Sequence, residues 1–296
     1  MSNISIETKK FTELLNATSA ADNALLLFRD GEGVKTITVA NFKADLKQLI
    51  NEKHNDLAGR LNASGAGAHN AIFRGKNLGS SVTAEQYAAI KAGTFDDMYI
   101  GDYWEISGVR YRIAAFDYYL TTGDTACNEH HVTVVPDTSL YSHVMNDTNI
   151  TTGAYVGSKM YTEGLTQAKT TINAAFGEGH ILNHRQYLQN AVTDGYASGG
   201  SWYDSTVELM TEQNVYGGRI FSNVQNGTAL PNSYTIDKSQ YPLFAFRPDL
   251  ISNRITYWLR DVATAADFAY VNYYGYAYAY YASYSRGVRP AFSIKS

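Results

Sequence analysis

Cysteine, long apolar runs and clustered basic residues are all scarce in this sequence, and each shortage excludes a class of structure or partner. Cys127 is the only cysteine, so no disulfide can form within the chain, and we expect synthesis in a reducing cytoplasm. No apolar run approaches the length that spans a bilayer. The first ten residues also lack the apolar stretch of a secretory signal. The sequence therefore predicts a protein without membrane insertion.

The charged residues indicate neither a nucleic-acid nor an anionic-membrane partner. The net charge is −4, and the Lys and Arg residues are scattered singly, whereas a phosphate-binding surface needs a basic patch. Hydrophobic residues make up 45% of the 296 positions and charged residues 18%, a balance that can bury a core. The length suits one large domain, or a compact domain with an attachment region in front of it.

Common enzyme signatures are missing as well. The sequence contains no Gly-x-Gly-x-x-Gly after a strand, no phosphate-binding Gly-Lys-Ser/Thr loop, no Gly-x-Ser-x-Gly and no His-Glu-x-x-His. Acid pairs such as Asp96-Asp97 are common in turns and do not by themselves specify acid–base catalysis. We therefore predict a protein that is not an enzyme and that needs no cofactor.

One cluster could carry chemistry, namely Cys127-Asn128-Glu129-His130-His131. A thiol, a carboxylate and two imidazoles this close could ligate a metal or form a nucleophile–base pair. Adjacent residues on a strand point to opposite faces, however, so His130 and His131 cannot both ligate one ion without a bend. The favoured interpretation is one buried and one exposed histidine beside a loop, with no metal site.

Residues 1–65 are predicted to form a separate, mostly exposed attachment or oligomerisation region. Two strands are expected at 25–28 and 34–39, followed by a helix over 42–61 that Asn41 can cap. The apolar stripe of this helix fits either an amphipathic helix on a small domain or a bundled oligomer stalk. The small residues of 62–70 mark a boundary, and residues 66–296 form the second domain.

The second domain is predicted to be α+β, with antiparallel strands and long loops. A capping box at Thr83 opens a short helix that Gly93 can close, and residues 98–104 and 109–114 form a hairpin. Further helices are expected at 157–176, 183–192 and 205–210. Further strands are expected at 131–136, 243–246, 255–259, 268–271 and 289–294.

The most unusual segment lies near the C-terminus, where eight of the fifteen residues from Tyr270 to Tyr284 are tyrosine. Tyrosine offers a large, rigid contact area with a hydrogen-bonding tip, which is typical of recognition surfaces. In an extended segment Tyr274, Tyr276, Tyr278 and Tyr280 share one face. A core row of phenols would need many buried hydrogen-bond partners. The segment therefore favours an exposed binding surface over the alternative of a tyrosine-rich core hairpin.

The frame around this segment resembles a known family. Tyr257-Trp258-Leu259-Arg260 precedes it and Gly287-Val288-Arg289-Pro290-Ala291-Phe292 follows it. This arrangement resembles the variable proteins of diversity-generating retroelements, in which adenine-directed mutagenesis rewrites chosen codons near the 3′ end of the gene. Residues 95–104 and 202–205 extend the resemblance over about residues 70–296.

The resemblance implies a C-type lectin-like fold and a place at the tip of a phage tail fibre, as a homotrimer. It implies a hypervariable receptor-binding protein of a phage or prophage, whose variable segment covers about residues 260–286. Its partners would be a bacterial surface protein or glycan and, through the N-terminal region, other tail proteins. Trp258, Arg289, Pro290 and Phe292 would be scaffold. The implied ligand contacts are Tyr273, Tyr274, Tyr276, Tyr278, Tyr280, Tyr281, Tyr284, Asn272, Ser283, Ser285, Ala263 and Ala265.

Two alternatives remain open at this point. One is a lectin or adhesin of fixed glycan specificity, although the Glu-Pro-Asn, Gln-Pro-Asp and Trp-Asn-Asp signatures of calcium-dependent lectins do not occur. The other is an enzyme with the lectin-like fold that uses Glu129 with His130 or His131.

Overall fold

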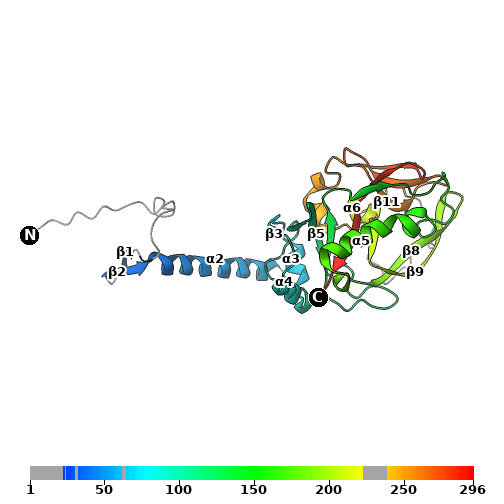
Figure 1. The fold of residues 1–296 in the computed structure, drawn as a ribbon. Coiled ribbons are helices and arrows are strands. Elements are labelled where there is room, and N and C mark those ends of the chain that lie inside the picture. The colour runs from blue at the N-terminus through cyan, green and yellow to red at the C-terminus, as the bar shows by residue number, and fades with distance from the viewer. Residues whose placement is uncertain (1–22, 24, 31–32, 62–64, 223–238) are drawn as a thin grey trace, which may run out of the picture. The chain divides into compact units, whose positions relative to one another are not determined.

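A computed structural model describes residues 23, 25–30, 33–61, 65–222 and 239–296 (Figure 1). By its internal contacts the chain divides into two units, Met1–Leu61 and Asn62–Ser296. Within the described ranges, no helix is both long and apolar enough to cross a bilayer.

The first unit contains a hairpin followed by a long helix. Strands β1 (Leu25–Asp30) and β2 (Gly33–Thr38) pair antiparallel, and α2 (Val39–Leu61) follows at once, so both predicted strands and the helix are confirmed. The helix begins earlier than predicted. The backbone N–H of Asn41 donates to the Thr38 hydroxyl (3.2 Å), so Thr38 rather than Asn41 lies in the capping position. Leu25, Leu27 and Ile50 are exposed on this unit.

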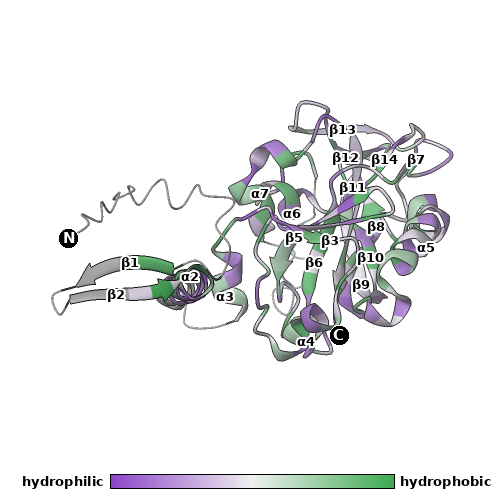
Figure 2. Ribbon diagram, turned by 60° about the vertical axis from the view of Figure 1, so that its left-hand side comes forward, coloured by the Kyte–Doolittle hydropathy of each residue, from purple (hydrophilic) through white to green (hydrophobic). Residues whose placement is uncertain are grey.

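The second unit is built on two larger sheets and a separate hairpin. The six-stranded sheet has the order β10 (Val207–Leu209), β15 (Pro290–Ile294), β6 (Val132–Pro136), β5 (Val109–Phe116), β4 (Tyr103–Ile106) and β3 (Asn77–Gly79). The five-stranded sheet has the order β13 (Ala277–Tyr281), β12 (Asp267–Val271), β11 (Tyr257–Val262), β14 (Arg286–Val288) and β7 (Tyr141–His143), and Figure 2 shows these strands together at the top. Strands β8 (His184–Thr193) and β9 (Tyr196–Ser205) form the hairpin.

Most neighbouring strands are antiparallel, and short helices pack around the sheets. The α-helices are α3 (Ala66–Asn70), α4 (Ala84–Ala92), α5 (Leu165–Phe176), α6 (Glu212–Tyr216) and α7 (Pro242–Phe246). Phe176 at the end of α5 contacts the rings of Trp104, Tyr111 and Phe292 on three strands of the six-stranded sheet. The predicted α+β class is confirmed.

Several local predictions hold because the deciding signals are local. Helix α4 has the predicted capping box between Thr83 and Gln86, and Gly93 ends it in a left-handed conformation. The predicted hairpin is β4–β5, although its first strand covers Tyr103–Ile106 and not 98–104, and the predicted strand at 131–136 is β6. The predicted helix at 157–176 is α5 with a π-helical turn (Met160–Gly164) before it.

Three predicted elements are wrong. Residues 183–192 form strand β8, not a helix, and burial alternates over its first half, with His184, Gln186 and Leu188 buried. Residues 205–210 contain strand β10 and not a helix. Helix α6 follows it, with Thr211 as the capping residue. Residues 243–246 are helical in α7, because Pro242 at the first helical position favours that conformation.

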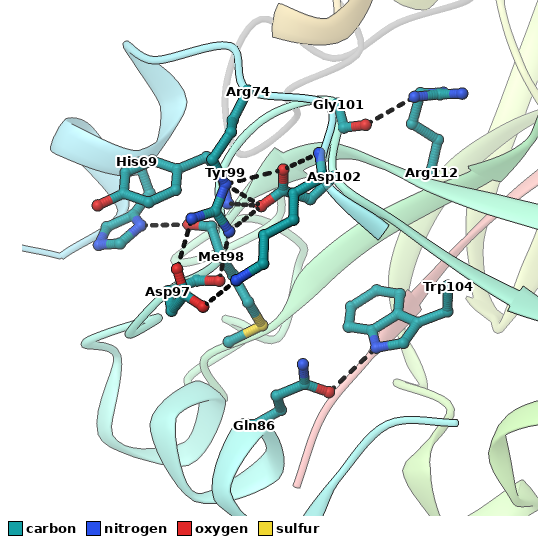
Figure 3. A network of polar contacts seen from close by, with 11 residues as sticks. His69, Arg74, Gln86, Asp97, Met98, Tyr99, Gly101, Asp102, Trp104 and Arg112 are labelled. Carbon is teal, nitrogen blue, oxygen red and sulfur yellow. Dashed lines mark hydrogen bonds and ion pairs between the residues drawn. The ribbon is translucent and has the colours of Figure 1, made fainter. Parts of the chain in front are cut away.

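A network of hydrogen bonds and ion pairs stabilises residues 97–102, which directly precede β4 (Figure 3). The fully buried Asp102 carboxylate accepts hydrogen bonds from Arg74 (2.6 Å) and from the backbone N–H groups of Lys76 (2.7 Å) and Tyr99 (2.8 Å). Lys76 and Arg74 also pair with Asp97. Although burial alone would raise the pKa of Asp97, the hydrogen bonds from Lys76 and Arg74 lower it. The predicted turn at Asp96-Asp97 is confirmed, and Asp97 stabilises the fold through its pairs with Arg74 and Lys76.

Candidate ligand-binding surface

The tyrosine-rich segment forms the hairpin β12–β13 at one edge of the five-stranded sheet. Tyr270 lies opposite Tyr278 and Phe268 lies opposite Tyr280. The turn is closed by hydrogen bonds from the Gly275 N–H to the Asn272 carbonyl (2.8 Å) and from the Asn272 N–H to the Tyr276 carbonyl (2.9 Å). Gly275 has φ = 94°, a conformation that glycine adopts without a steric penalty. The backbone of the segment is therefore fixed by its own pairing.

Buried scaffold residues hold this hairpin from behind. Trp258 on β11 is fully buried and its indole N–H donates to the His143 carbonyl (3.0 Å). Arg289 joins β14 to β15, one strand in each large sheet, and its buried guanidinium donates to the carbonyls of Pro136 (2.7 Å) and Ile251 (2.6 Å). Pro290 and Phe292, the other expected scaffold residues, are buried as well.

Most tyrosines of the segment are exposed, and we call them the tyrosine surface. Tyr274 is 75% exposed and Tyr276 51% exposed, whereas Tyr270 is only 5% exposed. Ala277 on β13 is buried, whereas Tyr278 and Tyr281 on the same strand are exposed. The tyrosine surface consists of Tyr273, Tyr274, Tyr276, Tyr278, Tyr280, Tyr281 and Tyr284, of which Tyr280 is half-buried and the others are exposed.

The rings touch one another in an unbroken series. Centroid distances are 5.5 Å for Tyr273–Tyr274 and 6.4 Å for both Tyr274–Tyr276 and Tyr276–Tyr278. The series continues through the buried ring of Tyr270, which lies 5.9 Å from Tyr278 and 6.4 Å from Tyr280. Tyr280 and Tyr284 are 4.6 Å apart. Each ring limits the freedom of its neighbours, so the surface is preorganised for contact.

The shared face differs in part from the sequence prediction. Tyr278 and Tyr280 lie on one face of β13 as expected, but Tyr274 and Tyr276 belong to the turn rather than to an extended strand. The turn brings their rings nearly parallel, with an interplanar angle of 6°. The predicted row of four rings on one strand face is therefore wrong in geometry, although all four rings lie on the same connected surface.

Phe221 extends the tyrosine surface, and the sequence analysis missed it. Its ring is exposed and lies 5.4 Å from that of Tyr278. The buried carboxylate of Glu212 accepts hydrogen bonds from the N–H groups of Ile220 (2.9 Å), Phe221 (3.0 Å) and Ser222 (2.9 Å). An acid at the start of a short helix thus fixes a segment eight to ten residues later, which no local pattern reveals.

The Glu212 position is supported by a second buried acid. The Glu212 N–H donates to the Asp261 carboxylate (2.6 Å) on β11. Burial, and next to it the nearby charge of Glu212, raise the pKa of Asp261 to about 7. Asp261 thus connects the sheet under the tyrosine hairpin to the segment that carries Phe221.

The predicted polar contacts have structural partners of their own. The Asn272 side chain accepts a hydrogen bond from the Tyr274 N–H (2.9 Å) and so stabilises the turn. The Ser283 hydroxyl donates to the side chain of Asn149 (2.7 Å), whereas Ser285 is exposed.

The two predicted alanine positions lie apart from the rings. Ala263 is buried and Ala265 is exposed in the turn between β11 and β12. Both line a surface concavity of about 430 Å³, to which Asp194 in the β8–β9 turn and Tyr196 at the start of β9 also contribute. The two alanines therefore line a separate concavity and are not part of the tyrosine surface.

Both histidines of the Cys127–His131 cluster make hydrogen bonds within the domain. His131 is fully buried and its ring accepts a hydrogen bond from the Tyr119 N–H (3.0 Å), while the His130 ring contacts Asp117 (2.7 Å) and is partly exposed. The predicted burial of one histidine is confirmed for His131, whereas the other, His130, is only partly exposed. Burial raises the pKa of the Cys127 thiol, which disfavours the nucleophilic thiolate. Among the described residues, no three His, Cys, Asp or Glu side chains group so as to hold a metal ion.

Residues 203–296 match a family model described as a domain of unknown function, DUF6273. The matched range includes the tyrosine surface, Phe221, Glu212 and the scaffold strands β11 to β15. No match was found among curated proteins or among solved structures.

Proposed function

We propose that this chain is a hypervariable receptor-binding protein of a phage or prophage, which attaches to a bacterial surface ligand through the tyrosine surface. The observation that carries the proposal is the connected series of rings from Tyr273 to Tyr284, most of them exposed and joined through the buried ring of Tyr270, on a hairpin whose backbone is fixed by its own pairing. Exposed apolar area of this kind on a globular protein is typical of a binding site.

The separation of exposed and buried residues supports variation at this surface. The rings project from the hairpin, while the resembling frame residues Trp258 and Arg289 are fully buried. Substitutions at exposed positions usually change stability by less than about 0.5 kcal/mol. New side chains at Tyr274 or Tyr276 would therefore change the ligand without unfolding the scaffold. A C-type lectin-like fold for residues 66–296 is part of this proposal.

The remaining parts of the proposal concern assembly. Residues 1–65 would attach the protein to other tail proteins at the fibre tip and join three copies. Leu25, Leu27 and Ile50 are exposed on the first unit, which suits burial against further chains. Three copies on one particle would add avidity to a weak single site.

Retention of bacterial cells by the immobilised full chain tests the binding role. The double variant Tyr276→Ala/Tyr278→Ala should lose retention of every isolate that the unaltered chain retains, with an unchanged thermal melt. Phe246→Ala, which removes an exposed ring on α7, is the matched control and should retain cells normally. Unchanged retention by the double variant, or loss of its cooperative melt, would contradict the proposal.

A further inference from the structure

A cation lies at one end of the tyrosine surface, and no carboxylate among the described residues pairs with it. Arg286 begins β14, and its guanidinium carbon lies 3.8 Å from the ring centroid of Tyr270, 4.7 Å from that of Tyr280 and 5.5 Å from that of Trp258. Stacking of this kind holds a planar guanidinium in one orientation and leaves its edge free to donate hydrogen bonds.

Other arginines of the same unit are paired with carboxylates. Arg185 pairs with Asp124 (2.8 Å) and Arg247 with Asp249 (2.6 Å). Within the part of the chain that the structure describes, no carboxylate pairs with Arg286, and its buried Nε–H has no hydrogen-bond partner. The positive charge of Arg286 is therefore balanced by no carboxylate of the described residues, which leaves the guanidinium available to an anionic ligand.

The surroundings of Arg286 favour an anion. Asp267, the one carboxylate on β12 or β13, accepts a hydrogen bond from the Thr264 hydroxyl (2.7 Å). At the opposite end of the tyrosine surface the exposed Arg254 lies 5.7 Å from the Tyr273 ring centroid and also lacks a carboxylate partner among the described residues. The surface thus has a cation at each end, although the whole chain carries a net charge of −4.

We propose that the tyrosine surface binds a carboxylate-bearing glycan, whose acid group pairs with Arg286 while its sugar rings stack on the neighbouring phenols. The proposal rests on the binding role argued above and names the ligand class for that same surface. Arginine offers the bidentate geometry that a carboxylate accepts. Phenol rings offer flat apolar faces and hydroxyl tips, which suit the apolar face and the hydroxyl groups of a sugar. Arg286 is half-buried, so the acid group of the ligand would have to be small and to project from the sugar ring.

An array of acidic oligosaccharides tests the ligand class. Glycans carrying glucuronic, galacturonic or nonulosonic acid are printed beside their own methyl esters, which keep the sugar and remove the charge. The full chain should retain at least one acidic glycan about ten- to a hundredfold more strongly than its ester, as expected for a charge-assisted hydrogen bond. Retention of acid and ester alike, of no acidic glycan, or of a polyglutamate peptide in their place overturns the proposal.

Variants assign the effect to Arg286. Arg286→Gln should lose the preference for the acid, Arg286→Lys should keep part of it because the charge remains, and Arg185→Gln should keep all of it. Thermal melts check that each variant is folded. An unchanged preference in folded Arg286→Gln overturns the proposal. If the chain retains a neutral glycan and loses it in Tyr276→Ala/Tyr278→Ala, the binding role stands and only the proposal of an acidic ligand is overturned. Retention that survives Tyr276→Ala/Tyr278→Ala overturns the binding role itself.

Discussion

Tyr278 lies directly across the hairpin from Tyr270, with ring centroids 5.9 Å apart, yet Tyr278 is 45% exposed and Tyr270 only 5%. One ring of the pair therefore belongs to the scaffold and the other to the surface. Buried residues such as Tyr270 support the hairpin, and exposed residues such as Tyr278 contact the solvent. Substitutions of the two kinds of residue should therefore differ in their effect on stability.

Replacement of Tyr270 should be far more costly than replacement of Tyr274. Tyr270→Ala removes a buried ring that contacts Trp258, Tyr278 and Tyr280, so we expect a loss of about 3 to 5 kcal/mol in the free energy of unfolding. Tyr274→Ala should change it by less than about 0.5 kcal/mol. Urea denaturation of both variants measures the difference, and equal losses would show that the surface rings support the fold.

Glu212 should control the position of Phe221. In Glu212→Gln the carboxylate that accepts three backbone N–H groups becomes a weaker acceptor with one oxygen, so the segment 220–222 should open more often. Hydrogen exchange at Ile220, Phe221 and Ser222 should become faster by about tenfold or more. Amides of β5 serve as the internal reference. Unchanged exchange at 220–222 would contradict the role given to Glu212.

Asp261 should make the stability depend on pH. The pKa of its carboxyl is about 7 in the folded chain and near 3.8 when it is not buried, so between these values the folded state holds a proton that the unfolded state has lost. Its contribution to the free energy of unfolding should therefore fall as pH rises from 4 to 7, by about 4 kcal/mol in total, and stay level above 7. Denaturation of Asp261→Asn across the same range should lack this component. An identical pH profile in the variant would refute the assignment.

Gly287 should tolerate no side chain. A Cβ at this position would overlap the Ser139 hydroxyl and would lie 2.7 Å from the Thr256 carbonyl oxygen. Gly287→Ala should therefore lower the melting temperature by several degrees, as an overpacked core does. Gly179→Ala, where a Cβ meets no atom within 4 Å, is the control and should leave the melting temperature nearly unchanged. Equal melting temperatures would show that β14 can move away from Thr256.

Local signals predicted the parts of the fold that depend on a few neighbouring residues. The capping box at Thr83 and the turn that joins β4 to β5 form as predicted, because their stabilising contacts lie within a few residues or across one turn. The prediction of a helix at 183–192 is wrong, because pairing with β9 decides the strand conformation of β8.

The candidate site divides in the same way. Composition alone predicted the exposed tyrosines, since a buried row of phenols would lack partners. Phe221 and Arg286 were not predicted as contacts, because both are brought to the rings by tertiary contacts: Phe221 by Glu212 and Arg286 by Tyr270. The position of a single aromatic or basic residue in the sequence carries no sign of such a neighbour.

The central claim is that the tyrosine surface is a replaceable recognition site on an unchanging scaffold. Sequencing the 3′ end of the gene and its flanking DNA in many isolates tests this most directly. The account predicts an imperfect downstream copy of codons 260–290 near a reverse transcriptase gene, with differences only where that copy has adenine. Variation should fall on the tyrosine surface and spare Trp258, Arg289 and Phe292. A single invariant gene with no such copy would contradict hypervariability and leave a binding surface of fixed specificity.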